Sequence, residues 1–341
     1  MQTNIPRLAS GGMITNYYCT SRCRHCAYFC SPSWDKNYMT GGTAAGLLDI
    51  VKAKGCRSLH IGGGEPLLDP ESLLPVLEEF RKAGVSVDYI ETNSSWFKPT
   101  TAGREEAEKL LLELQQLGVS TLLISISPFH NEYIPFLKVE GVLEACRKTG
   151  TGIFPWVDSF RADLKHFDSE KTHSLDEYSE EFGPDYIPTI PNRYWVSFRG
   201  RALQTYKPYM QPQPYTGILK QSPGPCRELY DVSHFHVDLF GNYIPGLCTG
   251  LSIAAADLQG PVSSETYPFI SALMTEGIAG LAELTVKDYG FQPKEEYVSK
   301  CDLCYDIRKY LVTEKGIDSP DLQPAEYYRQ AAIPRQKKRN L

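Results

Sequence analysis

Three cysteines within eight residues, Cys19, Cys23 and Cys26, constrain this chain more than any other feature. Their spacing is C-x3-C-x2-C. A structural metal ion in a tetrahedral site takes four protein ligands. Three thiolates on one short loop instead suit a cubane iron–sulfur cluster that keeps one iron open for a small molecule. The spacing therefore predicts a metal site close to the start of the sequence.

A glycine run follows a short apolar segment further along the chain. It reads Gly62, Gly63, Gly64, Glu65 and Pro66. Glycine lets a backbone approach a ligand closely, and a glutamate accepts hydrogen bonds from a cationic amine. Glycine-rich turns between strands and helices are common, so this run gains meaning from its position after the cysteine loop.

The two motifs together resemble those of the radical S-adenosylmethionine (SAM) enzymes. In that family the three cysteines hold a [4Fe-4S] cluster, whose open iron chelates the amino and carboxylate groups of SAM. The resemblance implies that Cys19, Cys23 and Cys26 are the cluster ligands. It also implies that the turn from Gly62 to Pro66 lies along the amino group of SAM. One departure from the common pattern is His25, which stands where an aromatic residue usually precedes the third cysteine.

A zinc knuckle is the alternative for this loop, with His25 or Cys30 as the fourth ligand. His25 is adjacent to Cys26, which is poor geometry for two ligands of one ion, but Cys30 remains available. A zinc site would leave the glycine turn without an explanation.

Composition favours a soluble enzyme. The 341 residues are 42% hydrophobic and carry a net charge of -6. This negative charge argues against a generally basic surface that would bind nucleic acid. The sequence has no long apolar run, and its first 15 residues lack the apolar core of a signal peptide, so we expect no membrane partner and a cytoplasmic location. In that compartment the ten cysteines are expected to be ligands or buried thiols, not disulfides.

Short apolar segments alternate with longer amphipathic ones in the first two thirds of the chain. Strands are predicted over residues 58–61, 86–91, 120–127, 152–157 and 194–198, and helices over 70–83, 103–117 and 139–148. This alternation implies the α/β class, with a parallel sheet and helices outside it. The resemblance narrows the fold to a partial (β/α)6 TIM-like barrel, open on one side, over residues 1–205.

Chemistry in such barrels gathers at the carboxyl ends of the strands. Family members often carry a Thr-Asn pair after the third strand and a Ser-x-Asp pattern after the fourth, which assigns Thr92, Asn93 and Ser125 to the SAM site. Ser127 stands where the second pattern has aspartate, and its role stays open. The candidates for a catalytic base or an orienting group near the substrate are His130, Arg199 and Arg201, with His236 as a further possibility.

A second cysteine set lies in the last third of the chain: Cys226, Cys248, Cys301 and Cys304. Residues 235–245 are predicted to form a hairpin, and the last two cysteines begin a helix that places both sulfurs on one face. This order resembles the twitch module of radical SAM enzymes, and the cysteine arrangement is most similar to that of 2-deoxy-scyllo-inosamine dehydrogenases. There four cysteines ligate one auxiliary [4Fe-4S] cluster. A four-thiolate zinc site would use the same ligands.

The resulting organisation is a barrel over residues 1–205, a twitch domain over 206–312 and a tail over 313–341. Residues 206–225 are expected to be an extended connector, residues 163–185 a lid or a plain surface insertion, and residues 335–339 a solvated end.

The resemblance implies a flavodoxin or ferredoxin as reductant, and a radical that removes hydrogen from a substrate. A fully ligated auxiliary cluster would take the second electron, which predicts a two-electron oxidation. Because the cluster loop is reached by residue 19, no amino-terminal peptide-binding domain is expected, which favours a small molecule over a ribosomally made peptide. The alternative from another class is a metal-binding protein without radical chemistry.

Overall fold

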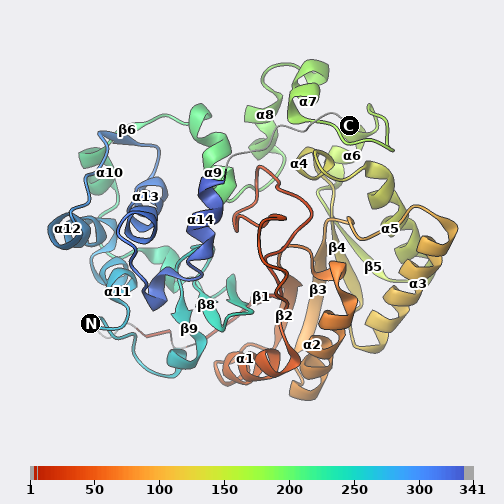
Figure 1. Ribbon diagram of the computed structural model, residues 1–341, viewed down its shortest axis with the longest axis horizontal. Coiled ribbons are helices and arrows are strands. Elements are labelled where there is room, and N and C mark those ends of the chain that lie inside the picture. Colours follow the sequence, from red (N-terminus) through yellow and green to blue (C-terminus); the bar gives the residue numbers. More distant parts are fainter. Residues whose placement is uncertain (1–3, 6, 334–341) are drawn as a thin grey trace.

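The computed structural model describes residues 4, 5 and 7–333, and its frame is one mixed sheet (Figure 1). Five parallel strands run in the order β5-β4-β3-β2-β1, and β7, β8 and β9 continue the sheet beyond β1. The bounds are β1 Gly11–Ile14, β2 Ser58–Gly62, β3 Ser86–Thr92, β4 Thr121–Ser125, β5 Gly152–Trp156, β7 Phe235–Asp238, β8 Asn242–Ile244 and β9 Ile253–Ala254. The sheet stays open between its edge strands β5 and β9 in the described residues, as expected for a partial barrel.

The helices between the parallel strands confirm the predicted alternation. They are α1 Gly41–Ala53, α2 Pro70–Ala83, α3 Thr101–Gln116 and α5 Phe136–Thr149. Local signals set their ends. In α2 the side chain of Asp69 accepts a hydrogen bond from the Ser72 amide, Pro70 opens the first turn and Gly84 ends the helix in the left-handed conformation.

The predicted strand over residues 194–198 is wrong. Those residues form no sheet pairing, and the place of a sixth parallel strand is taken by β7, which pairs with β1 on the opposite edge. The strand β1 itself was missed because Gly11 and Gly12 have low strand propensity. A Cβ on Gly11 would lie 2.4 Å from the carbonyl oxygen of Phe235, so glycine is required for this pairing.

The hairpin prediction over residues 235–245 is confirmed by the antiparallel pair β7 and β8. The remaining helices are α4 Pro128–Asn131, α6 Arg161–Leu164, α7 Leu175–Phe182, α8 Tyr186–Thr189, α9 Gly200–Tyr206, α10 Tyr215–Gln221, α11 Pro268–Thr275, α12 Gly277–Tyr289, α13 Lys300–Thr313 and α14 Glu326–Ala332. A separate small sheet pairs β6 Gln213–Pro214 with β10 Glu296–Tyr297. The segment 206–225 is therefore not simply extended, because it contains α10. The insertion 163–185 is helical in part, and Tyr178 hydrogen-bonds to Asn131 below it.

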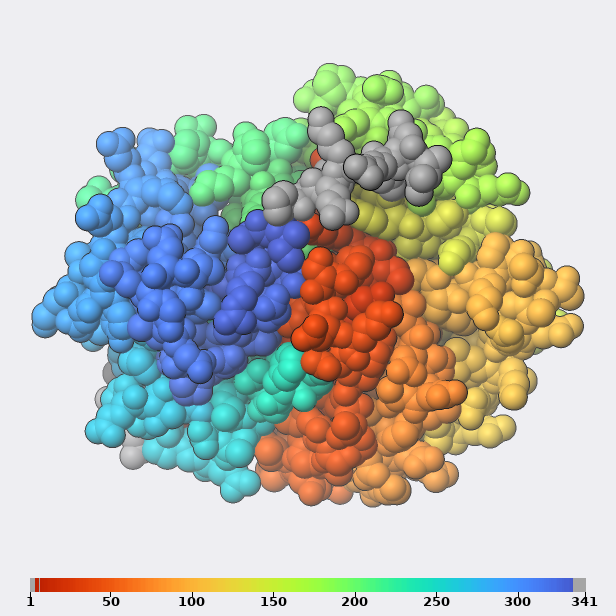
Figure 2. Space-filling model, in the orientation of Figure 1, coloured from red at the N-terminus to blue at the C-terminus, as the bar shows by residue number. Residues whose placement is uncertain are grey.

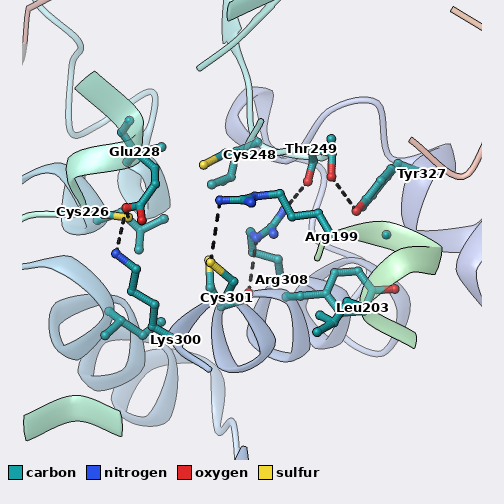
Figure 3. A pocket seen from close by; sticks show the side chains of 17 residues that line it. Arg199, Leu203, Cys226, Glu228, Cys248, Thr249, Lys300, Cys301, Arg308 and Tyr327 are labelled. Carbon is teal, nitrogen blue, oxygen red and sulfur yellow. Dashed lines mark hydrogen bonds and ion pairs between the residues drawn. The ribbon is translucent and has the colours of Figure 1, made fainter. Parts of the chain in front are cut away.

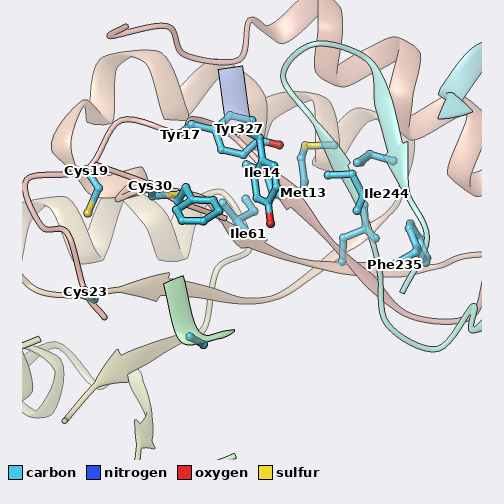
Figure 4. Packing of buried hydrophobic residues seen from close by; sticks show 14 of the residues in the cluster. Met13, Ile14, Tyr17, Cys19, Cys23, Cys30, Ile61, Phe235, Ile244 and Tyr327 are labelled. Atoms are coloured by element: carbon cyan, nitrogen blue, oxygen red, sulfur yellow. The ribbon is translucent and has the colours of Figure 1, made fainter. Parts of the chain in front are cut away.

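The carboxyl-terminal part packs directly on the cysteine loop. In Figure 2 the blue carboxyl-terminal surface meets the red amino-terminal residues along one seam. Under that seam the ring of Tyr327 from α14 contacts Phe29, with centroids 5.0 Å apart. Figure 4 shows this core running from Tyr17 and Cys30 to Met13 and Ile244.

In the part of the chain that the structure describes, no helix has both the length and the apolar character needed to cross a membrane. The basic segment 335–339 lies outside the described residues.

Candidate active site

The three cysteines of the amino-terminal loop line one cavity of about 310 Å³ inside the open barrel. Cys19 and Cys23 are buried and Cys26 is partly exposed. The same cavity is lined by Gly63, Gly64, Pro66, Thr92, Asn93 and Ser125. Residues separated by more than 100 positions therefore meet at the carboxyl ends of β1 to β4, where the sequence predicted a SAM site.

The glycine turn supports the cysteine loop as well as the cavity. A Cβ on Gly64 would lie 1.9 Å from the carbonyl oxygen of Tyr18, and Gly63 abuts Asn16 in the same way. The Gly64 amide donates to Asn16 O at 2.7 Å and the Glu65 amide donates to Tyr18 O at 3.2 Å. These glycines therefore allow two protein segments to approach each other, a role that the sequence did not reveal.

Glu65 lies behind the cavity wall and is fully buried. Its carboxylate accepts hydrogen bonds from the Asn93 amide, the Leu67 amide and the Thr92 hydroxyl, at 2.6, 3.1 and 3.0 Å. Burial raises the pKa of Glu65 to about 7. Its side chain therefore joins the glycine turn to the end of β3, and Glu65 does not line the cavity itself. Gly62 likewise lies in β2 behind the cavity wall.

Asn93 links this network to the cysteines, because its side-chain amide donates to Cys19 Sγ at 3.3 Å. His25 packs on Phe129, with ring centroids 4.6 Å apart, and meets His130 edge-on. His130 lines the cavity, and its Nδ1 lies 2.7 Å from the Ser127 hydroxyl. Burial lowers the pKa of His130 to about 4, so this imidazole is neutral at pH 7.

The two arginine candidates lie at different places. Arg201 donates from Nε to Cys23 O at 2.9 Å and from Nη2 to Cys30 O, so it holds the cysteine loop while its other face lines the cavity. Its Nη1 is buried without a hydrogen-bond partner in the described residues. Arg199 does not line this cavity and belongs to the second cysteine site.

That second site brings Cys226, Cys248, Cys301 and Cys304 around one narrow cavity of about 40 Å³ (Figure 3). Cys301 and Cys304 occupy the first turn of α13, where Ser299 caps the helix, so the predicted helix and its shared face are confirmed. Burial raises the pKa of Cys248 to about 12. No group of three or more His, Cys, Asp or Glu in the described residues is close enough to hold a single metal ion.

Cationic side chains surround the second site. Arg199 extends between Cys248 and Cys301, with Nη2 3.9 Å from Cys301 Sγ (Figure 3). Lys300 Nζ lies 2.8 Å from Glu228 Oε2, and Cys226 Sγ lies 3.2 Å from the same oxygen. Buried Arg308 donates to Cys304 O and Thr249 O. This arrangement provides positive charge beside four sulfurs.

The segment Arg199–Arg201 connects the two sites. Arg199 contacts the second site, the Arg201 amide donates to Cys26 O at 3.0 Å, and a Cβ on the intervening Gly200 would lie 2.2 Å from Ala27 O. The predicted burial of Cys56 and Cys146 is confirmed. Cys30 is also buried; it lines the first cavity, and its thiol donates to Gly63 O at 3.7 Å.

A polar group on the barrel floor consists of Glu91, His60 and His236, on β3, β2 and β7. His236 was a candidate from the sequence, whereas Glu91 and His60 were missed. Glu91 and His236 line the cavity, with His60 behind them. The alternation of side chains between the two faces of β2 and β3 is the sequence signal that could have pointed to His60 and Glu91. The parallel pairing of β1 with β7, which brings His236 to this place, did not follow from any local pattern.

Comparison with protein families identifies residues 13–156 as a match to the radical SAM superfamily. The match includes the three cysteines, the glycine turn, the Thr-Asn pair and Ser125. Residues 13–156 are therefore similar to a radical SAM domain, and the cofactors of that superfamily are SAM and a [4Fe-4S] cluster.

No curated protein matches the chain. Among solved structures, Streptococcus suis SuiB bound to S-adenosylmethionine is 14% identical with a TM-score of 0.33, over 72% of this chain and 61% of SuiB. The anSMEcpe structure with bound AdoMet is 12% identical with a TM-score of 0.42, over 89% of this chain and 95% of that one. HydG, a maturase of the [FeFe]-hydrogenase, is 14% identical with a TM-score of 0.33, over 53% of this chain and 41% of HydG.

The residues around the first cavity fit the family's cofactors. Three sulfurs approach it from one loop, and no fourth protein ligand is needed for a cluster that leaves one iron open. Gly63, Gly64 and the polar residues at the ends of β3 and β4 line the same cavity, and a ligand site of this kind combines an enclosing wall with a few polar groups.

Proposed function

We propose that the protein is a radical SAM oxidoreductase that removes two electrons from a small-molecule substrate. The observation that carries this proposal is the pairing of two cysteine sites of different kinds, joined by Arg199–Arg201. One has three cysteines beside a cavity large enough for a cofactor and substrate, and the other has four cysteines around a narrow one.

Cys19, Cys23 and Cys26 would hold the cluster, and Gly63, Gly64, Pro66, Thr92, Asn93 and Ser125 would bind SAM. When bound, cluster and SAM supply a 5'-deoxyadenosyl radical that abstracts a hydrogen atom from the substrate. The chain's own contribution is to fix the loop through Gly64, Asn93 and Arg201, and to surround the reacting atoms with a barrel wall that limits water.

Cys226, Cys248, Cys301 and Cys304 would hold an auxiliary [4Fe-4S] cluster, which takes the second electron. Four thiolates leave no iron open for substrate, and Arg199, Lys300 and Arg308 offset the charge of a thiolate-ligated cluster. A flavodoxin or ferredoxin would reduce the first site. This assignment makes the protein dehydrogenase-like.

The test is anaerobic incubation of the reconstituted full chain with SAM and either dithionite or reduced flavodoxin. We expect 5'-deoxyadenosine and methionine in equal amounts. A reconstituted protein that holds iron and sulfide but releases neither product from SAM would refute radical chemistry and leave a metal-binding protein.

A further inference from the structure

A row of polar residues crosses the floor of the cavity. In the sheet, Gly12 of β1 is paired with His60 on one side and with His236 on the other. A Cβ on Gly12 would lie 2.2 Å from His60 Nε2. The missing side chain lets the two imidazoles meet across β1, with their Nε2 atoms 3.2 Å apart.

The surroundings keep this histidine pair neutral. His236 Nδ1 lies 2.9 Å from the Tyr28 hydroxyl, Tyr89 stacks on His60, and His234 packs within 5.1 and 5.7 Å of the two rings. Burial, followed by the neighbouring imidazoles, lowers the pKa of His60 to about 3 and that of His236 well below its usual value. Both rings are therefore neutral at pH 7, and His60 is the one that lies beside Glu91.

Glu91 is the carboxylate of this group. Its Oε1 lies 3.8 Å from His60 Nε2, and Gly62 leaves space for its Oε2, which would lie 2.9 Å from a Cβ at that position. No donor in the described part of the chain forms a hydrogen bond with this carboxylate. The side chain is 42% accessible, and because it lines the cavity, this surface opens toward the predicted substrate space. Although part of the side chain faces the cavity, its burial among the surrounding barrel strands raises the pKa of Glu91 to about 7.

This carboxylate differs from Glu65, which is saturated by three donors. Besides His60, the titratable groups near Glu91 are three tyrosines and the buried Glu65, and none of them donates a hydrogen bond to it; the tyrosines are Tyr28, Tyr89 and Tyr194. A carboxylate that is free of donors and faces a cavity can accept a proton from a bound molecule. Its pKa lies near the pH at which an enzyme works, which is the condition for efficient general base catalysis.

We propose that Glu91 is the general base that deprotonates a substrate hydroxyl group, so that the oxidised substrate is an alcohol. His60 and His236 are positioning residues, and the absence of a side chain at Gly12 allows their imidazoles to meet. This inference rests on the proposed function, because the base acts on the radical which that function produces.

The step balances as follows. The hydrogen atom on the carbinol carbon passes to the 5'-deoxyadenosyl carbon, and the hydroxyl proton passes to a Glu91 oxygen. The remaining electron leaves for the auxiliary [4Fe-4S] cluster, and the C–O bond becomes C=O. Deprotonation before electron loss makes the radical a stronger reductant, so the base matters for oxidation and not for hydrogen abstraction.

The experiment uses the reconstituted full chain with SAM, dithionite and three probes deuterated at their carbinol carbons: myo-inositol, glucose and glucosamine. Wild-type protein is compared with Glu91→Gln, Glu91→Asp and the control Asp88→Asn, which changes an exposed carboxylate on the same strand. Deuterium in 5'-deoxyadenosine reports hydrogen abstraction, and the carbonyl product reports oxidation.

We expect Glu91→Gln to transfer deuterium like the wild type while carbonyl formation falls about 10²-fold or more, the usual contribution of a general base. Carbonyl formation by wild type should rise with pH around 7, with this dependence lost in Glu91→Gln and retained by Glu91→Asp at a lower rate. Carboxyl NMR of the wild type against Glu91→Gln should show one group titrating near pH 7, which checks the base apart from turnover and in a folded sample.

Carbonyl formation by Glu91→Gln within twofold of wild type would overturn the base assignment. Deuterium transfer from none of the three probes, in a wild-type protein that cleaves SAM, would overturn the alcohol as substrate. Failure of the wild type to cleave SAM would instead overturn the proposed function itself.

Discussion

The two cysteine sites use the same side chain but differ in the size of the cavity and in the groups that surround it. At the first, three cysteines from one loop border a cavity of about 310 Å³, and the loop is fixed by glycine contacts and by hydrogen bonds from Asn93 and Arg201. At the second, four cysteines from three distant segments enclose about 40 Å³ beside Arg199, Lys300 and Arg308. In the proposed function this difference corresponds to a first site that admits molecules and a second site that takes only electrons.

The strongest test of this difference removes one cysteine from each site. We expect Cys26→Ala to abolish 5'-deoxyadenosine formation, because the first cluster would lose a ligand. Cys304→Ala should spare SAM cleavage but block substrate oxidation. The matched control is Cys146→Ala, a buried thiol that lines neither cavity. Deoxyadenosine from Cys26→Ala, or normal oxidation by Cys304→Ala, would contradict the assigned roles.

Metal content separates a second cluster from a zinc site. Anaerobically reconstituted protein should hold about eight irons and eight sulfides, and a variant lacking Cys19, Cys23 and Cys26 about four of each. The measurement is iron, sulfide and zinc analysis. About four irons falling to none, with zinc bound, would show that the carboxyl-terminal cysteines form a structural zinc site.

The glycine contacts of the first site predict a smaller effect. A Cβ at Gly64 would overlap the Tyr18 carbonyl, so Gly64→Ala should cost about 1–3 kcal/mol of unfolding free energy and reduce iron at the first site only. Gly46→Ala is the matched control, since this position in α1 has nothing within 4 Å. It should stabilise the protein by about 0.5–1 kcal/mol. Denaturant unfolding measures the change in unfolding free energy for both variants. Equal effects of Gly64→Ala and Gly46→Ala would contradict the role assigned to Gly64.

The smallest effect is a pH signature of opposite sign at the two sites. Burial raises the pKa of Glu65 to about 7 from 4.5. Its contribution to stability is therefore full below pH 4.5 and is lost as pH rises through 7. At Glu228 burial raises the pKa, but the hydrogen bonds to the carboxylate, from Lys300 first, together with the Lys300 charge outweigh burial and lower the pKa to about 2. Its contribution to stability is therefore full above pH 4.5 and is lost as pH falls toward 2.

Thermal unfolding across pH 2–8 checks this. The difference in Tm between wild type and Glu65→Gln should change between pH 4.5 and 7, and that for Glu228→Gln between pH 4.5 and 2. Glu113→Gln, on an exposed part of α3, provides the baseline. Changes in the same pH window for both variants would mean that the environments of the two carboxylates do not differ as described.

Much of the fold could be predicted because its signals are local. Strands β2 to β5 and helices α2, α3 and α5 each carry their own periodicity, and Asp69 and Gly84 set the ends of α2 by contacts within a few residues. The spacing of Cys19, Cys23 and Cys26, and that of Cys301 and Cys304 on α13, are equally local. The failed strand at 194–198 shows the limit, because an apolar segment becomes a strand only where a partner edge is available.

What the sequence by itself determined was therefore the class of the domain, its alternating elements and the two cysteine sets. Only the tertiary structure decided that β7 pairs with β1, that Gly64 packs on Tyr18, and that Arg199 and Arg201 serve different sites. It also decided that Glu65 is saturated with donors while Glu91 faces the cavity without them. The reason is that these properties depend on neighbours that lie as far as 224 positions away, as for Gly11 and Phe235, which no local period or spacing encodes.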